Sequence, residues 1–415
     1  MTRPLAQQVA DSILPDSPDT LGVAVSGGGD SMALLHLLHG CCRDLDISLQ
    51  AITIDHGLRP EARAEAQMVE EFCRSLGVPH DTVQWRGWDG SGNLQNAART
   101  ARQRLIADWA QAKGIGTVAL GHTADDQAET ILMRLARQAG ADGLSAMAPR
   151  REGRGILWLR PLLSAGRAEL RSYLSENAIR WAEDPSNEDT AYDRIKARRA
   201  LVLLEPLGID AACLGAVASQ MADVRAALVW QTAQAAKALV QIRAGAVTFD
   251  AAGWHAQPRE IQRRLILAAI RWLTGTVYAP RRGAIGGLLE ALQTGRAATV
   301  EGCHAMVRRD SIWIFREANA VRSLETSPAD LWDGRWALAG PGEDACLQVR
   351  ALGEGGLAQC PEWRDTGLPR DVLLSTPAVW RGTDLVAAPL AGLARGWTAE
   401  VPGADDGFTL TALSH

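Results

Sequence analysis

The chain has 415 residues, of which 47% are hydrophobic and 22% are charged, a balance that is typical of globular proteins and excludes extensive disorder. No run of about 18 apolar residues and no N-terminal apolar signal core occurs, so neither a membrane span nor export is expected. The seven cysteines form no C-x-x-C pair, which argues against a zinc ribbon, an iron–sulfur site or a disulfide framework and favours a reducing, cytoplasmic location.

The formal net charge of −5 argues against a nucleic-acid partner, but the charge is unevenly distributed along the chain. Residues 1–130 contain ten basic and seventeen acidic side chains, whereas residues 255–316 contain ten basic and four acidic ones. Charge alone leaves open whether the second region is a solvated basic face or a surface for nucleic-acid phosphates.

Predicted strands and helices alternate over the first 150 residues. Short apolar or β-branched runs predict strands at residues 21–25, 49–54, 81–85 and 117–121. Periodic segments predict helices at residues 32–38, 61–76, 93–113 and 125–138, the third with Asn93 as its N-cap. This alternation predicts an α/β fold with a Rossmann-like, doubly wound parallel sheet, in which ligands bind beyond the carboxyl ends of the strands.

The rest of the chain predicts two further domains. Residues 167–177, 211–244 and 258–296 are helical by composition or periodicity, whereas glycine, proline and tryptophan become frequent from residue 327 onward. We therefore expect a catalytic domain at residues 1–205, a helical domain at 206–322 and a small α+β domain at 323–415.

The sequence Ser26-Gly27-Gly28-Gly29-Asp30-Ser31 connects the first predicted strand to the first predicted helix. Glycines allow backbone N–H groups to approach an anion, and the helix N-terminus adds positive partial charge, so this loop suits phosphate. It lacks the lysine of a Walker A loop and carries a carboxylate, Asp30, which implies Mg²⁺ bound jointly by the protein and a polyphosphate. The alternative is a tight turn in which Asp30 only caps the helix.

This loop matches the SGGxDS signature of the PP-loop ATP pyrophosphatases, with Gly29 at a position where larger residues are common. Further segments follow in order: DHGLRPE at 55–61, GHTADDQAET at 121–130, RPLL at 160–163 and WAEDPSN at 181–187. Over residues 21–204 the chain therefore resembles the tRNA(Ile)-lysidine synthetase family. Two segments, at 363–369 and 382–387, resemble that family's C-terminal domain.

The resemblance implies an ATP- and Mg²⁺-dependent ligase that acts on tRNA(Ile) with a CAU anticodon. In that reaction ATP adenylates the C2 oxygen of the wobble cytidine, with release of diphosphate. Free L-lysine then attacks C2 and displaces AMP, which gives lysidine. The resemblance is also compatible with a homodimer.

Individual residues acquire candidate roles from the same resemblance. Asp126 would bind the ammonium of lysine and remove a proton, because an amine with an ordinary pKa of ~10.4 is mostly protonated at pH 7. Glu129, three residues further on, would orient the lysine or a metal. His122 would lie near the nucleotide, and Arg102 would stabilise charge at the α-phosphate. Asp125 stays an alternative base, since paired acids are common in first turns of helices.

The residue types alone also permit plainer readings: His122 as a structural histidine, and Arg102 as part of a solvated helix face. Two groups of arginines are candidates for tRNA contact, because guanidinium groups suit phosphates and stacked bases. The first group is the run Arg194, Arg198 and Arg199. The second group lies at helical spacings that would follow the tRNA backbone, and it includes Arg263 and Arg264. For both groups the alternative is a solvated surface.

Two other classes of function remain open. One is another PP-loop enzyme, such as a tRNA thiolase or an amidating synthetase, although the chain has neither the cysteine pairs of many thiolases nor a recognisable amidotransferase nucleophile. The other is a non-catalytic module that binds ATP and RNA. ATP turnover that depends on lysine and tRNA distinguishes all three.

Overall fold

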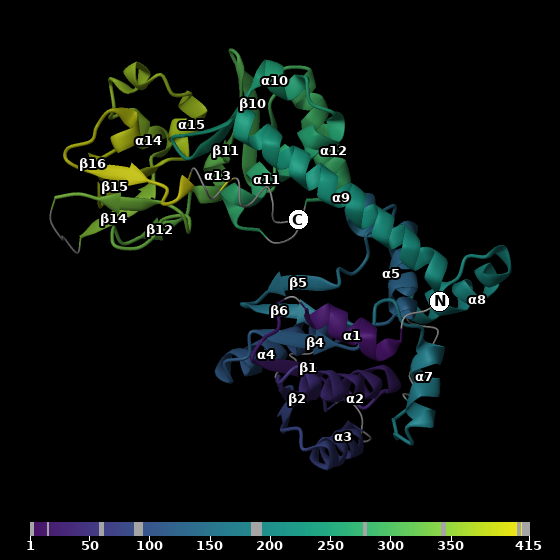
Figure 1. Cartoon of the computed structure of the whole chain (residues 1–415). Helices are drawn as coiled ribbons and strands as arrows, with labels where there is room; N and C mark the ends of the chain where they lie inside the picture. The colour runs from purple at the N-terminus through teal and green to yellow at the C-terminus, as the bar shows by residue number, and fades with distance from the viewer. Residues whose placement is uncertain are drawn as a thin grey trace. The chain divides into compact units, whose positions relative to one another are not determined.

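The computed structural model describes residues 4–14, 16–57, 62–86, 94–183, 193–276, 280–341, 346–404 and 408 (Figure 1). The expected cap Asn93 and parts of two family segments, at 58–61 and 184–187, lie outside these described residues. The chain forms two compact units, Met1–Arg225 and Ala226–His415.

The first unit is built on a six-stranded sheet with the order β3-β2-β1-β4-β6-β5. Every neighbouring pair is parallel except β5 and β6, which form an antiparallel hairpin at the edge. The strands are β1 (Thr20–Ala24), β2 (Ser48–Asp55), β3 (His80–Gln84), β4 (Thr117–Leu120), β5 (Arg150–Gly153) and β6 (Ile156–Leu159). The predicted doubly wound parallel sheet is confirmed.

Successive side chains of β1 point to opposite faces of the sheet, and each face has its own hydrophobic core. Leu21 and Val23 belong to one core, which also takes residues from α1 (Leu5–Ile13), α2 (Gly29–Asp44), α3 (Ala62–Leu76) and α7 (Arg167–Glu176). The opposite face packs on Ile106 and Trp109 of α4 (Leu94–Ala112). Helix α1 was not predicted, although its spacing of Leu5, Val9 and Ile13 buries one face.

The remaining helices of this unit pack on one another around α5. Helix α5 (Ala124–Ala136) packs against α8 (Asp193–Leu204), with the short α6 (Ala141–Leu144) and η2 (Glu205–Leu207) beside them.

The long α9 (Ala211–Leu239) runs from the first unit into the second. Among the described residues, α9 is the one helix long and apolar enough to span a membrane by length and composition. One such helix is weak evidence, because helices of proteins without a membrane meet the same criterion.

The second unit begins within α9 and contains helices α10 (Ala251–His255), α11 (Arg259–Thr274) and α12 (Arg282–Gln293). They pack on a five-stranded antiparallel sheet of order β7-β8-β11-β10-β9. Its strands are β7 (Val240–Arg243), β8 (Ala246–Asp250), β9 (Ala298–Val300), β10 (Cys303–Arg308) and β11 (Ser311–Arg316). The predicted helices are present here, and the structure adds a sheet that the sequence analysis did not predict.

The C-terminal part of this unit is a mixture of short strands and helices, as expected. A four-stranded sheet has the order β12-β14-β15-β16, and β13 pairs with β17. These strands are β12 (Glu325–Thr326), β13 (Ala337–Ala339), β14 (Leu347–Ala351), β15 (Pro377–Arg381), β16 (Asp384–Ala387) and β17 (Thr398–Glu400). The helices are α13 (Ala318–Val321), α14 (Gly353–Leu357), η3 (Trp363–Thr366), α15 (Arg370–Leu374) and η4 (Pro389–Ala391). The domain boundaries at 205 and 322 stay predictions.

A glycine in the central strand lets α4 pack closely on the sheet, and this can be tested by adding one methyl group. A Cβ at Gly22 would lie 3.1 Å from both Trp109 Cζ3 and Val118 Cγ2. We expect Gly22→Ala to lower the free energy of unfolding by about 1–3 kcal/mol through overpacking, as measured by urea denaturation. Gly40→Ala is the control, because a Cβ there meets nothing within 4 Å. Because Gly40 lies in the interior of α2, Gly40→Ala should raise the free energy of unfolding by about 0.5–1 kcal/mol. Equal effects of the two substitutions would contradict this packing argument.

Candidate active site

The site lies where the order of the strands reverses direction. Strands β1 and β4 are neighbours, and the chain leaves them for α2 and α5 respectively, so the loops after both strands meet at one edge of the sheet. A Cβ on Gly121, directly after β4, would lie 3.1 Å from the carbonyl carbon and oxygen of Asp30 and from Ser31 Cα. Position 121 must therefore be glycine for the start of α2 to lie this close to β4.

The segment from Ser26 to Ser31 forms the predicted strand–loop–helix connection. Gly27 has φ of +87°, a conformation that favours glycine. Ser31 Oγ donates to Gly28 O at 2.8 Å and accepts from Ser26 N at 3.1 Å, which closes the turn. Ala182 N donates to Gly27 O at 2.9 Å and secures the loop from outside. The loop thus presents the N-terminus of α2 as an anion site.

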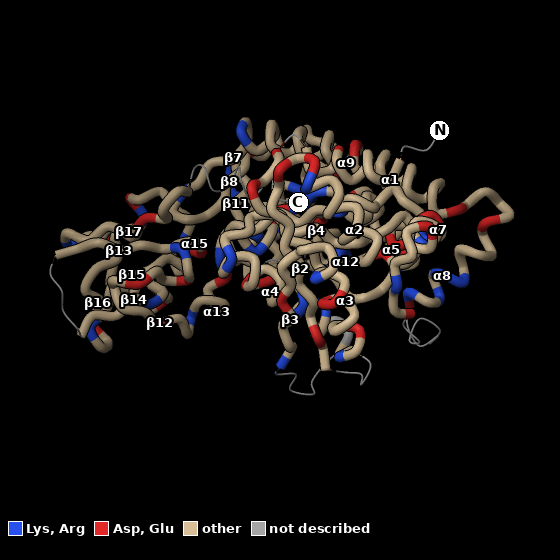
Figure 2. The backbone as a smooth tube through the Cα atoms, turned by 60° about the horizontal axis from the view of Figure 1, so that its bottom comes forward, with Lys and Arg blue, Asp and Glu red and all other residues tan. Residues whose placement is uncertain are grey.

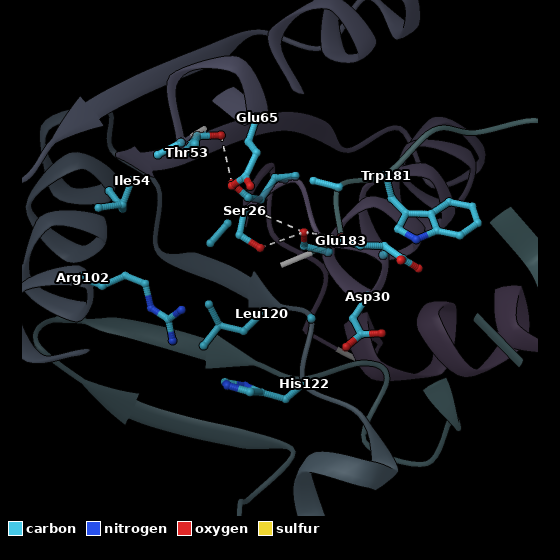
Figure 3. A pocket seen from close by; sticks show the side chains of 18 of the residues that line it. Ser26, Asp30, Thr53, Ile54, Glu65, Arg102, Leu120, His122, Trp181 and Glu183 are labelled. Carbon is cyan, nitrogen blue, oxygen red and sulfur yellow. Dashed lines mark hydrogen bonds between the residues drawn. The ribbon is translucent and has the colours of Figure 1, made fainter. Parts of the chain in front are cut away.

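A cavity of about 860 Å³ opens above this loop (Figure 3). One end is lined mainly by apolar side chains of the sheet and α4, namely Ala24, Ile52, Ile54, Ile106 and Leu120. The other end is polar, with Asp30, Arg167, Trp181 and Glu183 among its residues. An apolar end, an anion-binding loop and a charged end in one cavity suit a nucleotide and a second, charged substrate.

His122 lies at the apolar end of the cavity, near Arg102 and Leu120 (Figure 3). Its Nδ1 is buried without a hydrogen-bond partner among the described residues. Burial lowers the pKa of this imidazole to about 3; nearby Asp126 opposes that shift, whereas Arg160 and Arg102 add to it. His122 is therefore neutral at physiological pH and offers a ligand one donor and one acceptor.

Arg102 is half-buried in the cavity wall, and in the described part of the chain no hydrogen bond or ion pair is formed by its guanidinium. Its pKa is lowered by burial and by the neighbouring Arg99 and Arg194, although it stays a cation in water at any ordinary pH. An unpaired, partly buried cation is costly, so this group is suited to receive an anionic ligand.

Asp126 is buried at the N-terminus of α5, and both of its oxygens have partners. Oδ2 accepts from Thr123 N at 2.9 Å and from Thr123 Oγ1 at 3.1 Å, as part of a capping box. Oδ1 accepts from Arg167 Nη2 at 2.9 Å. Burial raises the pKa of this carboxyl, but Arg167, the Thr123 backbone bond and Arg194 together lower it below its ordinary value. Asp126 is thus a carboxylate at neutral pH.

Glu129 lies one turn further along α5, with only 1% of its side chain exposed. Three arginines surround it: Oε1 accepts from Arg198 Nε at 3.0 Å and from Arg167 Nη1 at 3.2 Å, and Arg194 Nε lies 3.7 Å from Oε2. Arg194 and Arg198 therefore reach into the cavity from α8, a helix rich in basic positions (Figure 2). Arg199, next to them, is exposed on the same helix.

Arg167 is a central residue of the site that the sequence analysis missed. Its Nε donates to Asp30 Oδ2 at 3.2 Å, in addition to the bonds with Asp126 and Glu129. A signal was present, because Arg167 is the first residue of α7, where a cation opposes the helix dipole.

Asp30 is half-buried in the first turn of α2. Burial raises the pKa of its carboxyl, Arg167 opposes this shift, and Asp126 adds to it. The described residues contain no group of three or more histidine, cysteine or acidic side chains able to hold a metal alone. A single carboxylate beside an anion loop nevertheless fits Mg²⁺, which is commonly bound by one or two carboxylates together with substrate phosphates.

The second predicted group of tRNA-binding arginines needs a correction. Arg264 on α11 is fully buried, and its Nε donates to Glu260 Oε1 at 2.9 Å. The predicted surface stripe therefore does not include Arg264, because the helix turns this side chain into the core of the unit. Arg263 is partly exposed, and it also donates to Glu260, from Nε at 2.8 Å. Its contact with tRNA stays a prediction.

The chain is similar to known proteins over most of its length. Residues 1–205 match the family model of a PP-loop domain. A tRNA(Ile)-lysidine synthase from Ruegeria pomeroyi is 51% identical over 399 residues, which cover 96% of this chain and 95% of that protein. Another, from a Bradyrhizobium species, is 38% identical over 312 residues, with coverage of 72% and 87%.

The chain belongs to the tRNA(Ile)-lysidine synthase family. This membership confirms the resemblance drawn from the sequence, and the protein is an enzyme with an ATP-using PP-loop domain. Among solved structures, the U34-tRNA thiolase NcsA from Methanococcus maripaludis matches at a TM-score of 0.47 and 15% identity, covering 53% of this chain and 77% of that one.

Gly121, which packs against the loop, and Gly29, which lies within it, allow a matched pair of substitutions to test the geometry of the loop. We expect Gly121→Ala to weaken ATP binding by about tenfold or more, because the added Cβ meets backbone atoms of Asp30 and Ser31 and displaces the start of α2. Gly29→Ala should change it less than about threefold, since a Cβ there makes ordinary contacts of 3.5 Å with Leu174 and Trp181. Equilibrium binding of a fluorescent ATP analogue measures both. Stronger damage from Gly29→Ala would contradict the proposed close approach.

The neutral His122 predicts how stability depends on pH. Its folded-state pKa of about 3 lies below the ordinary 6.5, so the unfolded chain binds more protons between these values. Stability from this group is complete above pH 6.5 and is lost as pH falls toward 3. The His122→Asn variant should therefore lose less stability than the unmodified protein between pH 7 and pH 4.5. Thermal unfolding across that range measures the difference, and parallel curves would refute this assignment.

Proposed function

We propose that this enzyme uses ATP to join free L-lysine to C2 of the wobble cytidine in the CAU anticodon of tRNA(Ile), giving lysidine, AMP and diphosphate. The observation that carries the proposal is the hydrogen bond from Arg167, which lines the charged end of a cavity whose floor is an anion-binding loop, to the carboxylate of Asp126 directly behind it. A nucleotide on that loop would have its α-phosphate between the apolar end and the carboxylates. Family membership supports the same reaction.

ATP would bind with its adenosine against the apolar end and its phosphates over the loop from Ser26 to Ser31. Neutral His122 would bond a polar atom of the nucleoside through its unpartnered Nδ1. Arg102 would stabilise the negative charge that develops at the α-phosphate. Asp30 would hold Mg²⁺, which supplies charge neutralisation to the triphosphate when bound.

The first step gives the poor electrophile at C2 a good leaving group. The C2 oxygen of cytidine attacks the α-phosphorus of ATP, the bond to the bridging oxygen breaks, and diphosphate leaves with that electron pair. A cytidine adenylated at O2 results. The loop N–H groups and Arg102 would bind the transferring phosphoryl group more tightly as charge accumulates on it.

The second step requires a neutral amine, because an ammonium has no lone pair. Asp126 would bind the ammonium of lysine and accept its proton, and the amine nitrogen then attacks C2. The bond from C2 to the adenylyl oxygen breaks, and AMP leaves. Glu129 would act on lysine through the arginines that surround it, because its own oxygens face Arg167, Arg194 and Arg198.

Exposed basic residues would bind the tRNA outside the cavity. Arg199 on α8 is exposed next to the cavity-lining Arg194 and Arg198, so α8 connects the carboxylate cluster with the protein surface. Arg263 would contact the tRNA backbone from the second unit. A homodimer, suggested by the family resemblance, and a cytoplasmic location, suggested by the absence of C-x-x-C pairs, complete the proposal.

The experiment that tests this function is nucleoside analysis of tRNA(Ile) after incubation with ATP, Mg²⁺ and isotopically labelled lysine. Labelled lysidine, formed together with AMP and diphosphate in equal amounts, is the expected result. A sulfur-containing nucleoside formed from a sulfur donor would favour a thiolase instead. ATP and RNA binding without any product would favour a non-catalytic module.

Substitution of Asp126 should separate the two chemical steps. We expect Asp126→Asn to retain diphosphate release with tRNA, because an amide still accepts the Thr123 hydrogen bonds that cap α5. Transfer to lysine should fall by at least about a hundredfold, since the general base is lost. Asp30→Ala should instead abolish diphosphate release. Radiolabelled ATP and lysine report the two steps, and normal lysidine yield from Asp126→Asn would remove its proposed role.

A further inference from the structure

Arg167 occupies the place where three carboxylates converge. Each nitrogen of its guanidinium donates to a different one: Nε to Asp30 at 3.2 Å, Nη1 to Glu129 at 3.2 Å and Nη2 to Asp126 at 2.9 Å. These carboxylates come from α2 and α5, two helices that begin at the adjacent strands β1 and β4. The cluster is therefore a preformed position for one cation, at the charged end of the cavity.

Hydrogen bonds that do not involve the Arg167 side chain hold the start of α7 in place. Arg167 N donates to Asp125 Oδ2 at 2.7 Å, and Ala124 N donates to Ala165 O at 2.9 Å, so the starts of α5 and α7 are joined. Further along, His36 Nδ1 and Tyr173 Oη lie 2.7 Å apart and connect α2 with α7. The side chain of Arg167 is 21% exposed and lines the cavity. Its guanidinium can leave the carboxylates by rotation of the side chain while α7 stays in place.

Access to Asp126 depends on that rotation. Its Oδ2 is committed to the capping box with Thr123, and its Oδ1 accepts from Arg167. A substrate amine can therefore reach Oδ1 only where Arg167 now lies. An alkylammonium carries three N–H donors and one positive charge. It can replace the guanidinium among the same three carboxylates without a change in the net charge of the cluster.

We propose that Arg167 is a positioning residue that makes lysine binding depend on bound nucleotide. Without nucleotide, its guanidinium holds the ammonium position. Phosphates on the loop give it a second anionic partner, and its departure from Asp126 opens that position to lysine. This inference rests on the proposed function, and it assigns to Arg167 the coupling between the ATP and lysine ends of one cavity.

The test is a binding measurement that needs no turnover. Isothermal titration gives the affinity of the full-length protein for L-lysine, with and without Mg²⁺ and an ATP analogue that has a methylene bridge between the α and β phosphates. We expect the analogue to tighten lysine binding by at least about tenfold, and lysine to tighten analogue binding by the same factor, as linkage requires. In Arg167→Gln this factor should fall to within about twofold of one, because lysine then reaches the carboxylates without nucleotide.

Arg43→Gln is the matched control, since it removes an equal charge from an exposed position on α2 outside the cavity. It should keep the full coupling factor. Equal lysine affinity with and without the analogue in the unmodified protein would overturn the inference, as would undiminished coupling in Arg167→Gln. If circular dichroism shows that Arg167→Gln is unfolded, the coupling factors of the unmodified protein and of Arg167→Lys still test the inference. The lysine variant keeps the charge but has one nitrogen in place of three, so it should show reduced coupling.

The outcomes also separate this inference from the function on which it rests. Lysine binding and lysidine formation without nucleotide coupling would overturn the role of Arg167 and leave the proposed reaction standing. Failure of lysine to bind in any state, including with tRNA and nucleotide together, would overturn both.

Discussion

The parallel pairing of β1 with β4 is the constraint on which the site depends. The two strands are adjacent in space although nearly 100 residues separate them in the sequence, and their carboxyl ends lie side by side. This pairing places the start of α2 against Gly121 and brings Asp30 near the carboxylates of α5. A shift of either strand would separate the anion-binding loop from the group proposed to activate the second substrate.

Charge compensation then decides how the charged end of the cavity is organised. Four acidic side chains accept hydrogen bonds from Arg167, which lines this end: Asp30, Asp126 and Glu129 from its guanidinium, and Asp125 from its backbone N–H. The arginines that face them come from α7 and α8, which follow in the chain. Buried carboxylates at such short separations are tolerated only when cations neutralise them, so the acidic first turn of α5 requires these later helices. The catalytic unit is therefore cooperative across most of its length.

Much of this could be predicted from the sequence, because its signals are local. Apolar runs ending at Ser26 and Gly121 marked the strands, and the glycines after them marked the loops. Arg167 and the burial of Arg264 were missed because both depend on tertiary contacts. Arg264 lies on a helix with arginines at several spacings, and only packing decides which of them faces inward. The sheet of the second unit was missed because helices α10, α11 and α12 lie between its strands β8 and β9, and their periodicity dominates the pattern of this region.

The double use of Asp126 has a consequence for how this enzyme can change during evolution. One oxygen of that carboxylate fixes the beginning of α5, and the other accepts from Arg167, which lines the cavity. Folding and substrate choice thus act on the same atom group, and few mutations can satisfy both demands. Substitutions that change the choice of amine are therefore easier to accommodate at Trp181 and Glu183, which line the cavity without capping any helix.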